Sequence, residues 1–352
     1  MKPQSPFRMI AILFLLSIPG MIFLLLLQRL PIDRFTSRTW EALALGSNRN
    51  APFLPLQRLE KLERGDLALH HPGAMTRKIQ FETDEFGYRN TAPACPDPYV
   101  VVIGDSMAVG GGLSQDETPA AQLSRALGKC VRSFAGGSFA YALNSVYGLG
   151  LRPRQVILIQ TQRSVGGLRA FQHPAKPGWG AHSLPWVQTW HRHYLEIRKN
   201  LYWNFRARHG VWNSLVRVSG SPEFSGQETP PSPGAPVLFY PGDQDRRVSE
   251  AEMDSDLRHL DELALALEPL GARLIYTYVP NKSTIYPGAP ADRDADFIDR
   301  FLPKAHTHRA RFIDLFHPYR EDWKKGIMNH HLEDTHWNAH GVARFIAEVL
   351  RE

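Results

Sequence analysis

The sequence predicts an α/β fold, a three-layer α/β/α sandwich around a mainly parallel sheet, with one N-terminal transmembrane helix in front of it. Two observations predict the sandwich. Short apolar runs alternate with segments whose apolar residues recur at helical spacing, and this alternation is typical of parallel sheets. The apolar run at 99–103 also ends in the turn Gly104-Asp105-Ser106, which would place polar side chains at the carboxyl edge of the sheet, where ligands collect.

Residues 9–27 form an uncharged, largely apolar stretch. At about 1.5 Å per residue, a helix of this length nearly crosses the ~30 Å core of a bilayer. No small-x-small cleavage site follows it, so the sequence favours an uncleaved anchor over a cleaved signal peptide. Arginines beyond the span weaken the positive-inside signal, but a short tail before a large domain favours a cytoplasmic N-terminus. We therefore expect a single-pass protein of the inner (cytoplasmic) membrane with its domain on the periplasmic side.

The chain then divides into an anchor at 1–30, a linker and lead-in segment at 31–95, and a catalytic domain at 96–352. Leucines between positions 54 and 62 of the linker fit a short helix. An insertion at 171–235 combines tryptophans with basic residues. Three interpretations stay open for it: a lid over a glycan, a surface against membrane headgroups, or tryptophans that complete the core.

Composition narrows the class of protein. A hydrophobic fraction of 43% indicates a globular chain, and the net charge of +6 suits an anionic membrane face or an acidic glycan. No basic block or known binding motif indicates nucleic acid as a partner. The two cysteines, Cys95 and Cys130, each precede a predicted strand, so both thiols would lie near one end of the sheet. A disulfide in an exported domain and two unpaired buried cysteines both stay open.

The remaining elements follow in chain order. Strands are expected where apolar runs are bounded by turn residues, at 131–137, from 156, and at 236–241, 273–279 and 311–315. Helices are expected where apolar residues recur at helical spacing, from 117 and at 250–270, 292–302 and 342–350. Gly271 is the expected C-cap of the second of these helices. Right-handed crossovers would stack these elements in three layers.

Ser106 is the candidate nucleophile. It lies between a buried strand and a helix opening, where backbone N–H groups can hold a developing oxyanion. A Gly-Asp-Ser turn is common in loops and does not by itself indicate a catalytic serine. A catalytic role also requires a base that can take the serine proton. Asp334 and His336 stand two residues apart on a loop before the final helix. In one cleft, Asp334 would orient the His336 imidazole, and His336 would take the serine proton.

A metal site is the alternative, since histidines and acids cluster at 330–340. His336 and His340 have the i, i+4 spacing of a helical zinc pair, but no glutamate stands next to His336 as the metalloprotease pattern requires. We therefore expect a nucleophilic site that uses no metal and no other cofactor.

The Gly-Asp-Ser turn and the later Asp334-Thr335-His336 segment together resemble the first and last blocks of the SGNH (GDSL-type) hydrolase superfamily, in that family's usual order. The resemblance spans residues 99–352. It implies an SGNH/flavodoxin-like sandwich in which Ser106 is the nucleophile, His336 the base and Asp334 the residue that orients it.

The same resemblance implies an oxyanion hole. Its donors would be the backbone N–H groups of Ser106 and, in the second block, of Gly136 or Gly137. The third block departs from the family, because the expected asparagine is missing after the third strand. Gln162 or Arg163 would then supply the third donor.

Two segments, at 278–287 and 334–338, are similar to segments of the alginate O-acetyltransferase group of SGNH-like proteins. Members of that group acetylate exported polysaccharides. In the group, the Asp-x-His-Trp segment precedes the Gly-Asp-Ser segment, whereas here it follows. The resemblance implies that Lys282 and Trp337 contact the substrate. Without it, Lys282 would be assigned to the surface.

These observations predict a membrane-anchored, extracytoplasmic O-acyl transferase, with acetyl as the expected acyl group. Its substrate would be a cell-envelope or exopolysaccharide, modified through an acyl-serine intermediate. One span cannot carry acetyl groups outward, so a multi-span, acyl-exporting membrane partner is expected. Two alternatives stay open: an SGNH esterase or lipase that releases acyl groups to water, and a non-catalytic glycan-binding scaffold, which the missing asparagine would fit.

Overall fold

The computed structural model describes residues 18–20, 22, 38–44, 52–68, 75–137, 139–168, 227–229, 237–243, 246–286 and 293–351. The predicted span at 9–27 and the predicted insertion at 171–235 lie almost wholly outside these ranges. No helix formed by the described residues combines the length and the hydropathy needed to cross a membrane.

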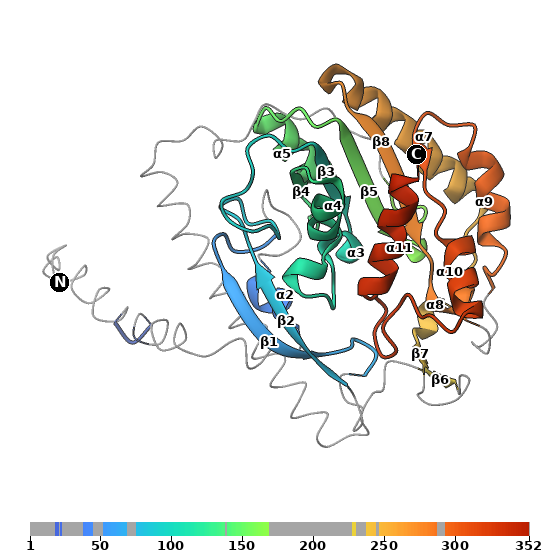
Figure 1. Ribbon diagram of the computed structural model, residues 1–352, viewed down its shortest axis with the longest axis horizontal. Coiled ribbons are helices and arrows are strands. Elements are labelled where there is room, and N and C mark those ends of the chain that lie inside the picture. The colour runs from blue at the N-terminus through green and yellow to red at the C-terminus, as the bar shows by residue number, and fades with distance from the viewer. Residues whose placement is uncertain are drawn as a thin grey trace, which may run out of the picture.

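A five-stranded parallel sheet forms the centre of the fold (Figure 1), in the order β4-β3-β5-β8-β9. Its strands are β3 (Val100–Gly104), β4 (Val131–Ser133), β5 (Gln155–Thr161), β8 (Arg273–Val279) and β9 (Arg311–Phe312). The prediction of an α/β fold built on a parallel sheet is therefore confirmed. Residues 100–103 of β3 are 0% exposed, as expected of a central parallel strand that is covered on both faces.

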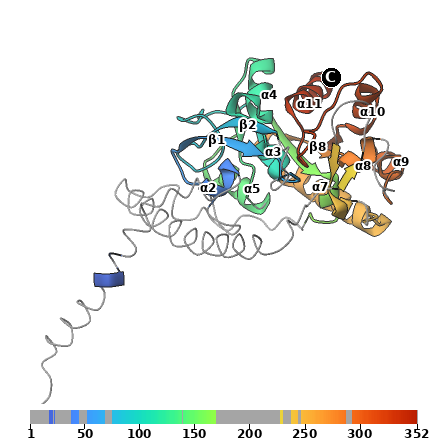
Figure 2. The same cartoon turned by 90° about the horizontal axis from the view of Figure 1, so that it is seen from below.

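Helices cover both faces of this sheet. In the view of Figure 2, α4, α10 and α11 lie above the sheet, and α5 and α7 lie below it. These helices are α4 (Pro119–Leu127), α5 (Phe139–Gly148), α7 (Glu250–Leu267), α10 (Phe316–Lys324) and α11 (Ala339–Leu350). The remaining long helix, α9 (Phe297–Ala305), packs against α7. The layers follow from right-handed crossovers between parallel strands.

Capping residues determine where the long helices begin. Thr118 accepts a hydrogen bond from the Ala121 amide at the start of α4, and Ser249 forms a capping box with Glu252 at the start of α7. After α7 the short 3-10 helix η5 (Glu268–Leu270) ends at Gly271, which has a φ of 69°. Gly271 is thus the C-cap of the helical segment that begins at 250, where a left-handed residue favours glycine.

The helix expected at 292–302 begins later, at Phe297. Residues 293–296 form turns instead. Aspartates in this stretch bond locally in non-helical conformations, which disfavours a helix interior. Arg300, one turn into α9, pairs with Asp294 and Asp296 and so holds the turn against the helix.

The lead-in segment forms a hairpin and not the predicted short helix. Strand β1 (Arg58–Arg64) pairs antiparallel with β2 (Thr76–Glu82). Leu59 lies opposite the buried Phe81, whereas Leu62 lies opposite Lys78 and is 65% exposed. The leucine spacing looked helical, but the pairing with β2 outweighs it, because cross-strand packing decides strand structure more than local propensity does.

A second small sheet lies apart from the main one. Strand β7 (Val237–Phe239) falls in the predicted extended run, and it pairs antiparallel with β6 (Gln227–Thr229). The Leu238 amide donates to the Leu332 carbonyl at 2.9 Å. This bond joins β7 to the loop that precedes α11.

The strand order places a topological switch point between β3 and β5. From β3 the chain proceeds outward to β4, and from β5 it proceeds in the opposite direction to β8. This is the flavodoxin-like order, and ligands in such sheets bind outside the carboxyl ends of the two strands at the switch point. Ser106 follows β3 at that position.

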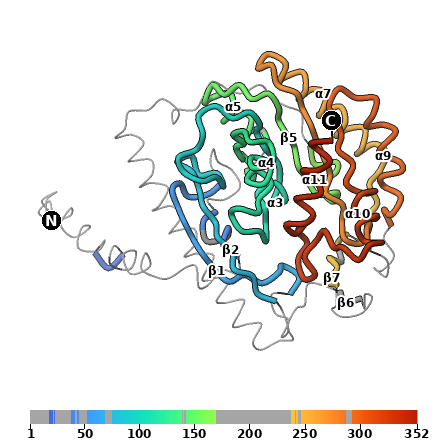
Figure 3. Tube along the Cα trace, viewed as in Figure 1, coloured from blue at the N-terminus to red at the C-terminus, as the bar shows by residue number. Residues whose placement is uncertain are grey.

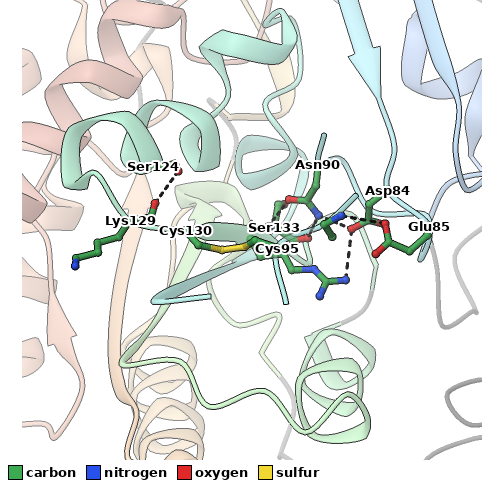
Figure 4. The surroundings of a disulfide bond; sticks show 10 residues. Asp84, Glu85, Asn90, Cys95, Ser124, Lys129, Cys130 and Ser133 are labelled. Atoms are coloured by element: carbon green, nitrogen blue, oxygen red, sulfur yellow. Dashed lines mark hydrogen bonds and ion pairs between the residues drawn. A yellow bond between two sulfur atoms is a disulfide. The ribbon is translucent and has the colours of Figure 1, made fainter. Parts of the chain in front are cut away.

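A disulfide joins Cys95 to Cys130, with the Cα atoms 6.4 Å apart (Figure 4). It connects the lead-in segment to the start of β4. Asn90 strengthens the same connection, because its side chain donates to the Ser133 carbonyl at 2.9 Å and accepts from the Ser133 amide at 2.7 Å. The lead-in segment is therefore tied to the sheet edge both covalently and by hydrogen bonds.

Removing this disulfide should destabilise the protein. The bridge closes a loop of 35 residues, for which chain entropy gives about 3–4 kcal/mol. We expect Cys95→Ala/Cys130→Ala to lower the free energy of unfolding by about that amount in urea titrations. Dithiothreitol should lower the stability of the wild type and leave the double variant unchanged. Equal sensitivity of both proteins to the reductant would contradict the assignment.

Candidate active site

The Gly104-Asp105-Ser106 turn is shaped by a close approach of β5. Gly104 has a φ of 144°, and a Cβ there would collide with the Ile159 carbonyl oxygen. Only glycine fits such a position without strain. The turn therefore depends on the absence of a side chain at the carboxyl end of β3.

Asp105 holds the turn in place. Its Oδ1 accepts from the Met107 amide at 2.9 Å and caps α3 (Ser106–Val109). Its Oδ2 accepts from the Thr161 amide at 2.8 Å, at the end of β5. Asp105 thus spans the switch point and positions Ser106, whose side chain is exposed.

Ser106, His336 and Asp334 form one hydrogen-bonded chain. The His336 Nε2 lies 2.8 Å from Ser106 Oγ. The His336 Nδ1 lies 2.6 Å from Asp334 Oδ1, and that same oxygen accepts from the His336 amide at 3.0 Å. This is the geometry of a nucleophile, a base and the residue that orients the base. The structure brings together the three residues that the sequence proposes as a triad.

Two guanidinium groups hold the other oxygen of Asp334. Arg38 Nη2 lies 2.8 Å from Asp334 Oδ2 and Arg77 Nη2 lies 3.1 Å from it. Burial by itself would raise the pKa of Asp334, but Arg38, His336 and Arg77 outweigh it and hold that pKa well below its usual range. The carboxylate is therefore ionised and keeps one oxygen directed at the imidazole.

Lys282 supports the loop that carries Asp334 and His336. It begins α8 (Lys282–Ile285) and is 3% exposed. Its Nζ donates to the carbonyls of His331 at 2.8 Å, Leu332 at 2.7 Å and Asp334 at 3.3 Å. Burial lowers the pKa of Lys282 to about 7, although nearby carboxylates favour the charged form. The predicted substrate contact of Lys282 is corrected, because its ammonium group is occupied by three backbone carbonyls.

Trp337 also differs from the prediction. It is 0% exposed and packs against Phe345 of α11, with ring centroids 5.6 Å apart. A substrate cannot reach a side chain that is fully covered, so the predicted substrate contact is wrong. Trp337 instead forms an antiparallel bridge with His330, which closes the loop between them.

His330 is a structural residue of this loop. Its Nδ1 lies 2.9 Å from the Tyr286 hydroxyl, and its Nε2 lies 3.0 Å from the Pro280 carbonyl. The carbonyl can only accept, so Nε2 carries the proton and Tyr286 donates to Nδ1. Burial lowers the pKa of His330 well below its usual range, which keeps the ring neutral.

A glycine turn after α3 lies against the His336 ring. A Cβ on Gly111 would lie 2.7 Å from His336 Cδ2 and Nε2. Arg89 holds this turn from beneath, since its guanidinium donates to the Gly110 carbonyl at 2.7 Å and the Leu113 carbonyl at 2.7 Å. The short 3-10 helix η2 (Gln115–Glu117) follows. The imidazole thus lies against bare backbone.

The predicted oxyanion donors have different surroundings. The Gly136 amide donates to the Gly104 carbonyl at 3.1 Å, so this N–H is already used. The Gly137 amide has no acceptor among the described residues, and Ser106 begins α3, where a first-turn amide lacks an intrahelical partner. Ser106 and Gly137 remain the predicted backbone donors. The prediction that Gly136 donates to the oxyanion is corrected.

The predicted third donors lie in the 3-10 helix η3 (Gln162–Ser164). Gln162 is 1% exposed, and its Oε1 accepts from the Asn281 amide at 3.0 Å and from Thr284 Oγ1 at 2.9 Å. The Gln162 Nε2, which would be the oxyanion donor, donates to Asp294 Oδ2 at 3.3 Å instead, so the predicted role of Gln162 as an oxyanion donor is corrected. Arg163 lies over the Tyr240 ring, 5.2 Å from the centroid, with Nε 3.6 Å from Asp243 Oδ1. The structure gives no contact between Arg163 and Ser106 within its described part.

One group of potential metal ligands occurs in the described part of the chain. Ligand atoms of Asp66, Asp334 and His336 lie within 4.8 Å of one another. Arg38 Nη2, however, lies 2.8 Å from Asp334 Oδ2 and 3.3 Å from Asp66 Oδ2. A guanidinium thus stands where these carboxylates would hold a metal cation. His340, the predicted partner of His336 in a zinc pair, is exposed in the first turn of α11.

Sequence reasoning missed the groups that surround Asp334. Arg38 precedes α2 (Thr39–Leu43), Asp66 follows β1, and Arg77 lies on β2. In Figures 1 and 3 the end of the hairpin approaches the red loop before α11. Asp66 accepts from the Thr335 amide at 2.7 Å. No motif marks these residues, since they lie in the segment interpreted as a linker and gain their role only through contacts across the fold.

Comparisons with known proteins add little. No protein-family model and no curated protein matches the chain. Among solved structures, an alpha/beta hydrolase enzyme from the metagenome of Lake Arreo, Spain, is similar with 14% identity and a TM-score of 0.36, covering 72% of this chain and 93% of that one.

Gly111→Ala tests the contact between the Gly111 backbone and the His336 ring. The added methyl group would meet the His336 ring at 2.7 Å, so we expect the ring to move away from Ser106. Misplacement of about 1 Å costs on the order of 10²-fold in reaction rate. The rate at which a fluorophosphonate labels Ser106 should fall by about that factor, with a stable fold in urea titrations. Unchanged labelling would contradict this arrangement.

Proposed function

We propose that this chain is a serine enzyme of the SGNH type that transfers O-acyl groups, with acetyl as the acyl group and a cell-envelope or exopolysaccharide as the acceptor. One observation carries the proposal: the hydrogen-bonded chain from the exposed Ser106 through His336 to the ionised Asp334. Its position at the switch point of the sheet supports it, because that is where such folds bind ligands.

In the proposed mechanism, Ser106 Oγ attacks the ester carbonyl carbon of the acyl donor while His336 Nε2 takes the hydroxyl proton. Asp334 stabilises the imidazolium that forms. The backbone N–H groups of Ser106 and Gly137 stabilise the tetrahedral oxyanion. The ester C–O bond then breaks, His336 returns the proton to the leaving alcohol, and the acyl group remains on Ser106.

The second half of the reaction repeats the chemistry with a new nucleophile. A sugar hydroxyl attacks the acyl-serine carbonyl, and His336 takes its proton. Collapse of the second tetrahedral intermediate frees Ser106, which recovers its proton from His336. Attack by water in place of the sugar gives an esterase. The hydrogen-bonded triad supports either enzyme over a non-catalytic glycan-binding scaffold.

The location and the partner belong to the same proposal. A single-pass anchor at 1–30 would hold the domain on the periplasmic side of the inner membrane, and the disulfide between Cys95 and Cys130 suits an oxidising compartment. One span cannot transport acetyl groups, so the transferase would depend on a multi-span acyl-exporting partner. Acetylation of glycans by the purified chain from a soluble donor alone would argue against that partner.

Active-site labelling tests the nucleophile. We expect a fluorophosphonate to modify Ser106 in the full chain, and Ser106→Ala and His336→Ala to abolish the reaction. Asp334→Asn should slow labelling by roughly 10⁴-fold, because the imidazole is left in the wrong tautomer. Ser124→Ala, which removes an α4 hydroxyl that donates to the Lys129 carbonyl, should label like the wild type. A folded wild-type chain that resists the probe would refute the proposed enzyme.

The fate of the acyl group tests transfer against hydrolysis. Mass spectrometry should detect an acetyl-Ser106 adduct after incubation with an activated acetyl ester. Acidic polysaccharide fragments should shorten the lifetime of the adduct and become acetylated. If the adduct decays at one rate with and without glycan and releases only acetate, the esterase alternative is correct.

A further inference from the structure

The lead-in segment places a buried arginine on the far side of the catalytic aspartate. The Arg38 side chain is 5% exposed and the Asp334 side chain 1% exposed. A buried carboxylate needs nearby positive charge and hydrogen bonds to stay ionised. His336 is hydrogen-bonded to Oδ1 of Asp334, so the negative charge on Oδ2 is stabilised by the hydrogen bonds from Arg38 and Arg77.

Arg38 is held rigidly by its surroundings. The amide of the next residue, Thr39, donates to the Glu63 carboxylate on β1. At the other end of α2, the Leu54 amide donates to the Leu43 carbonyl at 2.9 Å. The short helix is therefore fastened to the hairpin and to the segment after it, which gives the Arg38 guanidinium a defined approach to Asp334.

Arg38 and Arg77 are not equivalent. Arg77 also pairs with Glu333, and its side chain is 19% exposed against 5% for Arg38, so solvent screens the charge of Arg77 more. Arg38 instead bridges Asp334 and Asp66, at 2.8 Å and 3.3 Å. Asp66 in turn accepts from the Thr335 amide, between the two triad residues. Arg38 thus contacts Asp334 directly and Thr335 through Asp66.

We propose that Arg38 is a positioning residue of the active site, which fixes the Asp334 carboxylate so that Oδ1 stays aligned with His336. The segment that directly follows the predicted anchor then completes the catalytic machinery. This inference rests on the proposed function, since it assigns Arg38 a role in the reaction of Ser106.

The charged and titratable groups around the Asp334–His336 pair come from several elements. They are Arg38 before α2, Asp66 after β1, Arg77 on β2, Lys282 on α8, and His331 and Glu333 on the loop itself. Arg38 helps to hold the pKa of Asp334 low, so loss of its charge lets that pKa rise. The acid limb of the pH–rate profile should therefore move to higher pH.

The test measures fluorophosphonate labelling of Ser106 against pH in the full chain. Arg38→Ala should lower the labelling rate by about 10²-fold and move the acid limb upward, and added guanidinium ion should restore part of the rate. Arg38→Lys keeps the charge but not the two-sided fork, so it should lower the rate without moving the limb. If Arg38→Ala does not fold, Arg38→Gln carries the same test, with the same expected shift.

Arg132→Ala is the matched control. Arg132 is another buried arginine, on β4, with its side chain 4% exposed and its Nη2 3.6 Å from Asp84 of the lead-in segment. The Arg132→Ala variant should be less stable than the wild type, but its acid limb should not shift and guanidinium ion should not change its labelling rate. If the Arg38 variants behave like Arg132→Ala, or label like the wild type, Arg38 has only a structural role. Absence of labelling in the wild type would instead refute the proposed function itself.

Discussion

The buried charge of Asp334 is the constraint on which the site depends. Its side chain is 1% exposed, and an ionised carboxylate without compensation is unstable in such a place. Compensation comes from His336 on the same loop and from Arg38 and Arg77, more than 250 positions earlier in the chain. The hairpin β1–β2 and the helix α2 are therefore parts of the candidate active site, although they lie outside the main sheet.

The sheet determines where the other half of the site lies. Strands β3 and β5 are paired neighbours whose following connections lead to opposite edges of the sheet, and ligands in such sheets bind in a crevice outside the carboxyl ends of these two strands. Gly104 permits close contact with β5, and Asp105 then bonds across to the Thr161 amide. These two residues leave Ser106 exposed at the carboxyl end of β3. Gly104 and Asp105 therefore serve to position the serine, and Ser106 itself would carry the chemistry.

Much of this could be predicted from local patterns. The apolar strands, the capped helices and the roles of Ser106, Asp334 and His336 as one cluster follow from periodicity and from residue types that suit nucleophilic catalysis. The sequence predicts substrate contacts for Lys282 and Trp337, because their segments are similar to those of a known group. Both are buried. Motif similarity identified residues that matter to the loop and could not tell a substrate contact from a structural one.

The sequence by itself determined the alternation of strands and helices and the residue types of the triad, because these depend on spacing along the chain. Only the tertiary structure decided which groups neutralise Asp334, that the Gly136 amide donates to the Gly104 carbonyl, and that the Gln162 side-chain amide donates to Asp294. Each of those outcomes depends on contacts between segments far apart in the chain. Electrostatic and hydrogen-bond partners are chosen by proximity in space, and no local pattern records that proximity.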